Sequence, residues 1–484
     1  MSDCSSSLAN QLRSALASRS ARRILRRLPD PDPIPSPSSS STIDFTSNDY
    51  LSLSTSPHLR TLFLHKLSTA PRILGSGGSR LLTNGPAHAA LESRLAKFFT
   101  CEQALLFNSG FDANVAVFSC LPQPGDVVVY DEYIHASVHD GLRASRARAS
   151  HPFAHNSLPA LRRVLDTVVR QEDSRLRDGE GSVFVAVESL YSMDGTFAPL
   201  QEIVEMLESI FPRGNAYLVV DEAHATGIYG PQGRGRVAEL GLERKVLLRL
   251  CTFGKALAAT GAVVLTNTLI RDYLVNYARP LIYTTSLSFA NIIAADCAFD
   301  LLMDGTAQSL AHDLLALSTH FTAYLRALLA HAHIPPSVLS LPAHLSPPLP
   351  SLSPSLSPSP SPAPSPSPSP TPSPTPPPSP ILPLLTPHPH ALAHHLRTHH
   401  RLAARPITWP TVPRGAPRVR VCLRAALRRE EVEGLARGCV CWARGVVERE
   451  GVVEGERQAR TGSGRSEGCG WMEERERGWV ECKL

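Results

Sequence analysis

Three residues between positions 221 and 255 bring together a carboxylate, an imidazole and an amine. Asp221 follows the apolar run "YLVV", His224 comes three residues later, and Lys255 stands in "CTFGKALAATGA", where its neighbours are small, apolar or hydroxylic. An ammonium group is rarely left in such surroundings without a partner. Burial and a nearby cation would lower the pKa of this lysine, so that its amine could attack a carbonyl and form a Schiff base.

The letters "DEAH" at 221–224 also suggest an ATPase, in which adjacent acidic residues hold magnesium. That interpretation requires a phosphate-binding G-x-x-x-x-G-K-[ST] loop on an earlier strand. The only Gly-Lys pair in the chain ends at Lys255, with Arg249 where the first glycine belongs and Ala256 where the serine or threonine belongs. The sequence therefore argues against ATP hydrolysis.

An aspartate at a strand end followed by a downstream lysine is the layout of pyridoxal-phosphate enzymes. There the aspartate pairs with the pyridinium nitrogen, and the lysine forms the Schiff base. The cofactor ring accepts electrons only while its nitrogen stays protonated, and a buried carboxylate favours that state. Asp221 and Lys255 meet these two needs.

Three further motifs place polar groups at strand ends. Gly110 in "NSGFDAN" opens a helix whose N–H groups could hold a phosphate. His135 in "DEYIHAS" could stack on a planar ring, although an isolated histidine there is more often structural. Glu188 and Ser192 in "VESLYSMDG" would by themselves indicate only a turn.

The elements that must position these residues are short β-branched runs alternating with helical patterns from residue 44 to 286. Each run is followed by a polar or glycine turn, which indicates buried strands of an α/β sheet. Ligand sites in such sheets lie at the carboxyl ends of the strands. The runs are "QALLFNSG", "DVVVYDEYIHAS", "SVFVAVES", "AYLVVDEAHATG" and "GAVVLTN".

Nine motifs in order resemble the α-oxoamine synthases, fold-type I pyridoxal-phosphate enzymes that condense an amino acid with an acyl-CoA. Within that family the chain looks most like the 8-amino-7-oxononanoate synthases of biotin biosynthesis. The resemblance covers about residues 10–447, apart from a Ser-Pro segment. The motifs are "DFTSNDYLSLS", "GSGGSRLLTNG", "LLFNSGFDAN", "IHASVHDGLRAS", "VESLYSMDGTFAPL", "VVDEAHATGIYGPQGRGR", "TFGKALAATGA", "IYTTSLS" and "RPITWPTVPRG".

The resemblance implies roles for individual residues. Lys255, Asp221 and His135 would be catalytic, with His135 stacked on the ring and His224 bonded to the phenolic oxygen. Further cofactor contacts would come from Gly110, Phe111, Glu188, Ser192, Thr252 and, across a homodimer interface, Thr285. Substrate contacts would come from Arg26, Asn48, Arg405 and Thr411, with Arg405 pairing the amino-acid carboxylate.

The reaction implied joins L-alanine to pimeloyl-CoA and releases CoA and CO2, giving 8-amino-7-oxononanoate. A sibling enzyme is the alternative, such as 5-aminolevulinate synthase, 2-amino-3-ketobutyrate ligase or serine palmitoyltransferase. A non-catalytic subunit is a third, disfavoured because Lys255, Asp221 and His224 are retained. Two departures are Ala258, where the family has glycine, and the missing proline after Thr285.

Composition shifts divide the chain of 484 residues into four parts. Residues 1–43 hold a basic helix, from about Leu8 to Leu28, and a Pro/Ser linker. Residues 44–286 form a large cofactor domain, and 287–450 form a smaller α/β domain. A disordered Ser-Pro insert at 347–380 interrupts the smaller domain, either as a tolerated surface loop or as a ligand for SH3-like or WW-like modules. Residues 451–484 form a flexible tail.

Bulk properties exclude several classes of protein. The hydrophobic fraction of 43% suits a globular enzyme, and no apolar run is long enough to span a membrane. The net charge of +5 suits an anionic small molecule at least as well as nucleic acid, so no nucleic-acid partner is predicted. The ten cysteines show no zinc-type spacing and are interpreted as free thiols, with no metal expected.

The two ends of the chain carry competing targeting signals. Cys482-Lys483-Leu484 resembles the small-basic-leucine peroxisomal signal, which an import receptor would bind. The N-terminal "SLANQLRSALASRSARRILRRL" is Arg- and Ser-rich like a mitochondrial presequence. Because the family carries a basic helix there, the peroxisome is the favoured location, with mitochondrion and cytoplasm as alternatives.

Overall fold

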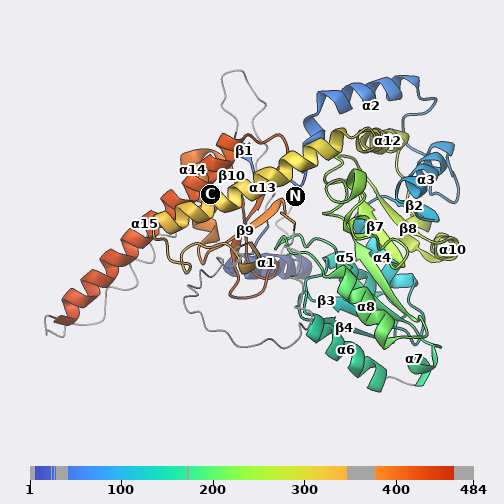
Figure 1. Ribbon diagram of the computed structural model, residues 1–484, viewed down its shortest axis with the longest axis horizontal. Coiled ribbons are helices and arrows are strands. Elements are labelled where there is room, and N and C mark those ends of the chain that lie inside the picture. Colours follow the sequence, from blue (N-terminus) through green and yellow to red (C-terminus); the bar gives the residue numbers. More distant parts are fainter. Residues whose placement is uncertain are drawn as a thin grey trace, which may run out of the picture.

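The computed structural model describes residues 6–22, 24–26, 28, 42–171, 174–345 and 377–462. Within them lie two main sheets with helices packed around each (Figure 1). The expected linker, most of the Ser-Pro insert and the terminal tripeptide lie outside the described residues.

The larger sheet has seven strands in the order β2-β8-β7-β6-β5-β3-β4. β8 runs antiparallel to both of its neighbours, and the other strands are parallel to one another. The strands are β2 (Gln103–Phe107), β3 (Val127–Asp131), β4 (Ala149–Phe153), β5 (Val183–Glu188), β6 (Ala216–Asp221), β7 (Leu248–Thr252) and β8 (Ala262–Thr266).

Helices cover both faces of this sheet because its strands are apolar on both sides. Along β5, Val185 packs into one core and Phe184 into another. The first core holds α6 (Leu158–Gln171) and α8 (Leu200–Ile210), and the second holds α4 (Gly110–Cys120), α5 (Ala136–Arg143) and α10 (Thr268–Tyr277). Other helices nearby are α2 (Pro57–Thr69), α3 (Pro86–Phe98), α7 (Ser174–Asp178), α9 (Arg236–Glu239), α11 (Arg279–Ile282) and α12 (Phe289–Met303).

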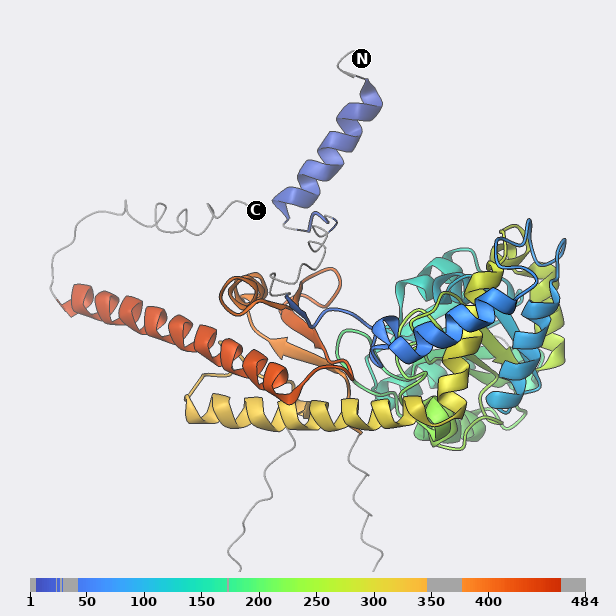
Figure 2. The same cartoon turned by 90° about the horizontal axis from the view of Figure 1, so that it is seen from above.

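The smaller sheet is antiparallel, with the order β11-β12-β9. Its strands are β9 (Ile381–Leu385), β11 (Arg405–Ile407) and β12 (Arg418–Cys422), while β1 (Ile43–Asp44) pairs with β10 (Leu402–Ala403) beside it. The long helix α13 (Thr306–His331) reaches it from the larger body, and α14 (Pro389–His400) and α15 (Arg429–Gly462) pack there too (Figure 2).

Three expected boundaries are wrong. The N-terminal helix α1 (Ser7–Ala21) ends well before Leu28, and it buries none of its residues. The Ser-Pro insert does not reach residue 380, because Ser379 is 1% exposed and its Oγ accepts from the Ile381 backbone. The last helix continues to Gly462, past the expected start of the tail at 451. No helix among the described residues is long and apolar enough to cross a membrane.

Candidate active site

The candidate site lies where β5, β6 and β7 end. Glu188 and Asp221 are the last residues of their strands and stand opposite each other in the β5–β6 register. Thr252 ends β7, which pairs with β6 on its other side. Because these parallel strands end at one edge, residues far apart in the sequence meet there, as the alternation of strands and helices predicts.

Asp221 is held as a buried carboxylate. It is 8% exposed, its Oδ2 accepts from Asn114 Nδ2 at 2.8 Å, and its Oδ1 accepts from the Ala223 backbone at 2.9 Å. The same Asn114 amide also donates to Ser137 Oγ at 3.0 Å. Two donors thus fix the orientation of the carboxylate.

A chain of hydrogen bonds leads from the smaller sheet to Lys255. Arg420 donates to Asn48 Oδ1 at 3.0 Å, and the Tyr50 hydroxyl lies 3.2 Å from the same oxygen. His224 joins the chain through Nδ1, 2.7 Å from the Tyr50 hydroxyl, and through Nε2, 2.9 Å from Lys255 Nζ. Asn48 Oδ1 can only accept, so the Tyr50 hydroxyl donates its hydrogen bond to that oxygen. The Tyr50 oxygen then accepts from His224 Nδ1–H. This leaves His224 Nε2 as an acceptor for the lysine.

Burial sets the protonation of this chain. It lowers the pKa of Lys255, with Arg420 lowering it further, while Asp221 and Glu188 oppose that shift. Burial and the Lys255 charge likewise lower the pKa of His224 well below its usual value. A neutral imidazole next to a lysine that loses its proton readily is the arrangement that a nucleophilic amine requires.

Glu188 is a carboxyl group in surroundings that disfavour its charge. Burial, followed by the charge of Asp221, raises its pKa well above the usual value. Its Oε1 has no hydrogen-bond partner among the described residues. The side chain is therefore in a position to give or accept a hydrogen bond to a ligand at the strand ends.

The N-terminus of α4 lies beside the end of β7. A side chain at Gly110 would place its Cβ 3.5 Å from Thr252 Cβ, which locates these two residues side by side. Ser109 caps the helix, and its Oγ accepts from the Asp112 backbone at 3.0 Å. Phe111 is exposed, and its ring stands edge-on to that of His135 at 6.4 Å between centroids.

The residues predicted to bind the substrate differ in where they lie relative to this hydrogen-bond chain. Asn48 lies in the hydrogen-bond chain, and Arg405 stands directly opposite Arg420 in the β11–β12 register, so both side chains lie on one face of the smaller sheet. Ser192 accepts from Arg420 Nε through its backbone oxygen at 2.6 Å. Thr411 is exposed in the turn that follows β11.

Arg26 and Thr285 lie outside this cluster. Arg26 is exposed and follows α1, which stands clear of both sheets (Figure 2). Thr285 is exposed, and its backbone oxygen accepts from Asn108 Nδ2 at 2.7 Å, so the loop that carries it lies beside the start of α4. Its predicted contact with a neighbouring subunit stays a prediction.

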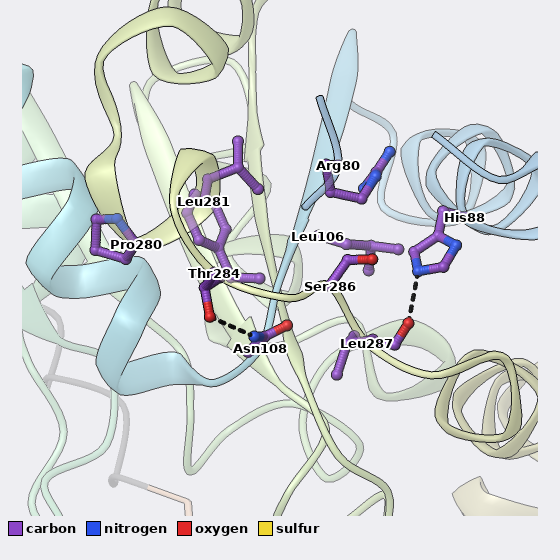
Figure 3. Close-up of a pocket in the computed structure, with 10 residues that line it drawn as sticks. Arg80, His88, Leu106, Asn108, Pro280, Leu281, Thr284, Ser286 and Leu287 are labelled. Carbon is purple, nitrogen blue, oxygen red and sulfur yellow. Dashed lines mark hydrogen bonds between the residues drawn. The ribbon is translucent and has the colours of Figure 1, made fainter. Parts of the chain in front are cut away.

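That loop also borders a pocket formed by α11, β2 and the segment before α12 (Figure 3). Asn108 donates to Thr284 Oγ1 at 3.4 Å on one side, and His88 Nε2 contacts the Leu287 backbone oxygen on the other. Lys255, Asp221 and His224 do not line this pocket, whereas Asn108, two residues before α4, does.

Sequence reasoning missed Tyr50, Asn114 and Arg420. Tyr50 lies within the motif "DFTSNDYLSLS", and Asn114 ends the motif "LLFNSGFDAN", but neither position carries a local sign of its role. Arg420 had a detectable signal, because "RVRVC" alternates arginine with valine in a strand, and Arg418 and Arg420 are 3% and 5% exposed. An arginine buried in a strand requires a polar partner.

The position of Glu222 also argues against the ATPase alternative. The residue is fully buried, and its Oε1 accepts from the Val237 backbone at 3.0 Å. Burial raises the pKa of this carboxyl to about 7. Glu222 therefore fastens the turn before α9 rather than facing a nucleotide.

The comparisons with known proteins place the chain in a family. Residues 40–438 match the family model for aminotransferase class I and II. This chain belongs to the aminotransferase class I and II family. It is 43% identical over 448 residues to the 8-amino-7-oxononanoate synthase of Emericella nidulans, covering 91% of this chain and 97% of that one. It is 44% identical over 281 residues to the aminoacyl transferase sphA of Aspergillus fumigatus, covering 58% of this chain and 60% of that one.

Solved structures agree on the fold. An 8-amino-7-oxononanoate synthase from Francisella tularensis superposes with a TM-score of 0.60 at 25% identity, covering 85% of this chain and 99% of that one. A serine palmitoyltransferase from Sphingomonas wittichii superposes at 0.70 with 24% identity, covering 92% and 100%. The protein is thus a fold-type I, pyridoxal-phosphate-dependent acyltransferase of the α-oxoamine synthase group.

The residues at the strand ends fit pyridoxal phosphate. A buried carboxylate is available for the ring nitrogen, an amine of lowered pKa for the aldehyde, and the N-terminus of α4 for the phosphate. The unpartnered Glu188 oxygen adds a further polar contact at the same edge.

Proposed function

We propose that this chain condenses L-alanine with pimeloyl-CoA to give 8-amino-7-oxononanoate, CoA and CO2, a reaction of biotin biosynthesis. The observation that carries the proposal is the 43% identity to an 8-amino-7-oxononanoate synthase over nearly its whole length, which spans both sheets. The site around Lys255 supports it, because the amine, the imidazole and the buried carboxylate that this chemistry needs lie together.

In the proposed mechanism, each residue has a task that its position supports. Pyridoxal phosphate, when bound, draws electrons from the amino-acid α-carbon. Asp221, whose carboxylate is held by Asn114, would accept a hydrogen bond from the protonated ring nitrogen. Lys255 Nζ, next to His224 Nε2, removes the proton from the α-carbon and later returns it.

Arg405 is proposed to bind the alanine carboxylate. Its guanidinium is exposed and has no hydrogen-bond partner among the described residues, and it shares a sheet face with Arg420. A planar guanidinium can hold a carboxylate through two parallel hydrogen bonds. Binding there would hold the substrate while the acyl group is added and the carboxylate is lost as CO2.

A second candidate is an α-oxoamine synthase that uses glycine or serine, such as 5-aminolevulinate synthase, 2-amino-3-ketobutyrate ligase or serine palmitoyltransferase. The identity to the aminoacyl transferase sphA favours it, being 44% over a segment of 281 residues. The shared segment is shorter than the one that supports the biotin reaction, so this candidate ranks second.

The deciding experiment measures CoA release by the full-length, cofactor-loaded protein. L-Alanine, glycine and L-serine are each tested with pimeloyl-CoA and with palmitoyl-CoA. The proposal expects release only with L-alanine and pimeloyl-CoA, and a preference for glycine, serine or the long acyl chain would overturn it. Lys255→Ala should abolish release, whereas Lys245→Ala, an exposed lysine paired with Glu208, should not alter it.

We further propose a homodimer whose site is completed by Thr285 of the neighbouring subunit. Its exposed position beside the start of α4 supports this role. Sedimentation of the loaded protein should give twice the monomer mass. Thr285→Ala should weaken cofactor binding without changing that mass. A monomer with full cofactor affinity would contradict the proposal.

The peroxisome is proposed as the location, on the terminal Cys482-Lys483-Leu484 signal. An N-terminal fluorescent fusion should enter peroxisomes and become diffuse when the three residues are removed. Unchanged targeting after their removal would refute the signal, and mitochondrial import of a C-terminal fusion would favour the N-terminal segment instead.

A further inference from the structure

Histidine and cysteine side chains gather where α14 meets α15, on the smaller body of the protein. α14 ends in "HHLRTHH", and Cys441 lies on α15, which packs beside it (Figure 1). One ligand atom from each of His395, His400 and Cys441 lies within 4.8 Å of the other two. These residues come from helices that the proposed reaction does not use.

The cluster contains a polar atom without a partner. His395 Nε2 is buried and makes no hydrogen bond with any described residue. The rings of His399 and His400 lie near it, with centroids 4.8 and 5.2 Å from that of His395. A buried nitrogen lone pair that nothing satisfies carries a free-energy cost, which a bound ion would offset.

The close approach of the two helices depends on Gly438. A Cβ at this position would stand 3.1 Å from His400 Cδ2 and 3.0 Å from Leu396 Cδ2. Gly438 precedes Cys441 by three residues, so the two lie on the same face of α15. The missing side chain therefore lets the His400 ring lie against α15 near the Cys441 thiol.

We propose that His395, His400 and Cys441 bind a thiophilic divalent transition-metal ion such as Zn²⁺. Two imidazoles and a thiolate are ligands that this class of ion prefers. Tetrahedral coordination separates neighbouring ligand atoms by about 3.5 Å, given metal–ligand distances of about 2.0 to 2.3 Å. The three ligand atoms lie within 4.8 Å of one another, and side-chain rotations would bring them to the separation that the ion requires.

Binding would release the Cys441 thiol proton to solvent, and His399 or a water molecule would supply the fourth ligand. Arg449 on α15 places a positive charge near His395, and the negative charge of the Cys441 thiolate would offset it. The ion would join the end of α14 to α15. That helix end is followed by Arg401, in the left-handed conformation at φ +57°, and then by β10 and β11.

The test uses full-length protein without an affinity tag, stripped of metal with a chelator. Titration with Zn²⁺ alone should give one equivalent bound per chain. Replacement of a ligand in His395→Ala, His400→Ala or Cys441→Ser should weaken binding at least about tenfold. The matched controls are His394→Ala, an exposed histidine on the same helix, and Cys439→Ala, a buried cysteine on α15, and both should bind Zn²⁺ like the parent.

Two further measurements keep the proposal falsifiable if a variant is unstable. Co²⁺ should produce a thiolate charge-transfer band that Cys441→Ser abolishes. Gly438→Ala, which keeps every ligand but moves His400, should weaken Zn²⁺ binding several-fold. Equal Zn²⁺ affinity in the ligand variants and the controls, or no binding by the parent protein, would overturn the proposal.

Discussion

His224 Nε2 lies 2.9 Å from Lys255 Nζ, and the other nitrogen of the same ring lies 2.7 Å from the Tyr50 hydroxyl. The imidazole therefore joins the amine to a phenol whose other contact, Asn48, is bound by Arg420 of the smaller sheet. Through this chain the position of one sheet is coupled to the orientation of a group at the edge of the other.

Tyr50→Phe should lower kcat about tenfold while leaving the KM for the amino acid nearly unchanged. The hydroxyl orients His224, and the loss of one buried hydrogen bond is worth about 1 to 1.5 kcal/mol. Steady-state CoA release measures both constants. The control is Tyr229→Phe, because this buried hydroxyl donates to the Pro378 backbone instead. Equal losses of kcat in the two variants would count against a positioning role for Tyr50.

Arg420→Gln should raise the pH at which the metal-free, cofactor-free protein captures pyridoxal phosphate. Lys255 captures the aldehyde only as a neutral amine, so the rate rises with pH and levels off above the lysine pKa. Burial lowers that pKa below 10.5, and the Arg420 charge lowers it further, so removing Arg420 raises it. Stopped-flow absorbance of pyridoxal phosphate, recorded over a series of pH values, gives the midpoint of this rise in rate.

The control for this shift is Arg424→Gln. Arg424 donates to the Asp44 backbone and is not among the charges that chiefly shift the pKa of Lys255. In Arg424→Gln, the pH midpoint of pyridoxal-phosphate capture should match that of the parent protein. A midpoint that stays constant or falls in Arg420→Gln would contradict the electrostatic explanation.

Asn114→Ala should weaken the binding of pyridoxal phosphate about tenfold. The amide orients the Asp221 carboxylate, and a hydrogen bond to a charged group contributes about 1.5 to 3 kcal/mol. Equilibrium dialysis of the cofactor gives the dissociation constant. Asn276→Ala, an exposed asparagine bonded to the Asp272 backbone, should leave it unchanged. An unaltered constant in Asn114→Ala would mean that Asp221 is oriented without its help.

Glu222→Gln should stabilise the protein at pH 8 by about 3 kcal/mol and much less at pH 5. Burial raises the folded-state pKa of Glu222 from 4.5 to about 7, so folding favours the neutral carboxyl. Below the unfolded-state pKa the Glu222 carboxyl is neutral in both states, so the folded protein keeps its full stability. As the pH rises from there through about 7, the unfolded state loses the proton first, and this stability is lost. Urea unfolding at the two pH values gives the difference, and a gain that is larger at pH 5 would refute the assignment.

Ala258→Gly should raise the free energy of unfolding by about 0.5 kcal/mol and leave kcat unchanged. Ala258 has φ +49°, and its N–H donates to the Lys255 backbone oxygen at 3.0 Å. Left-handed backbone costs an alanine about 1 to 2 kcal/mol, which exceeds the entropy that glycine adds to the unfolded chain. Ala259→Gly, where φ is not positive, should destabilise instead.

Local sequence was enough for the strands with uninterrupted apolar runs. β5 and β6 were predicted because "VFVAVE" and "AYLVVD" are apolar until their last residue. β7 was missed because Arg249 interrupts its run. In the fold this arginine is 2% exposed and donates to the Phe99 backbone. β4 was missed because, as an edge strand, "ASHPF" exposes Ser150 and Pro152 and so lacks an apolar run.

The sequence by itself determined the reactive groups, since Asp221, His224 and Lys255 are chemically distinct and follow recognisable strand ends. Only the tertiary structure decided what holds them in place. Arg420 and Asn48 are 372 positions apart, and Tyr50 and His224 are 174 apart. No local pattern reports a contact between segments so distant, because the packing of the two sheets, not the identity of neighbouring residues, brings their atoms within hydrogen-bonding distance.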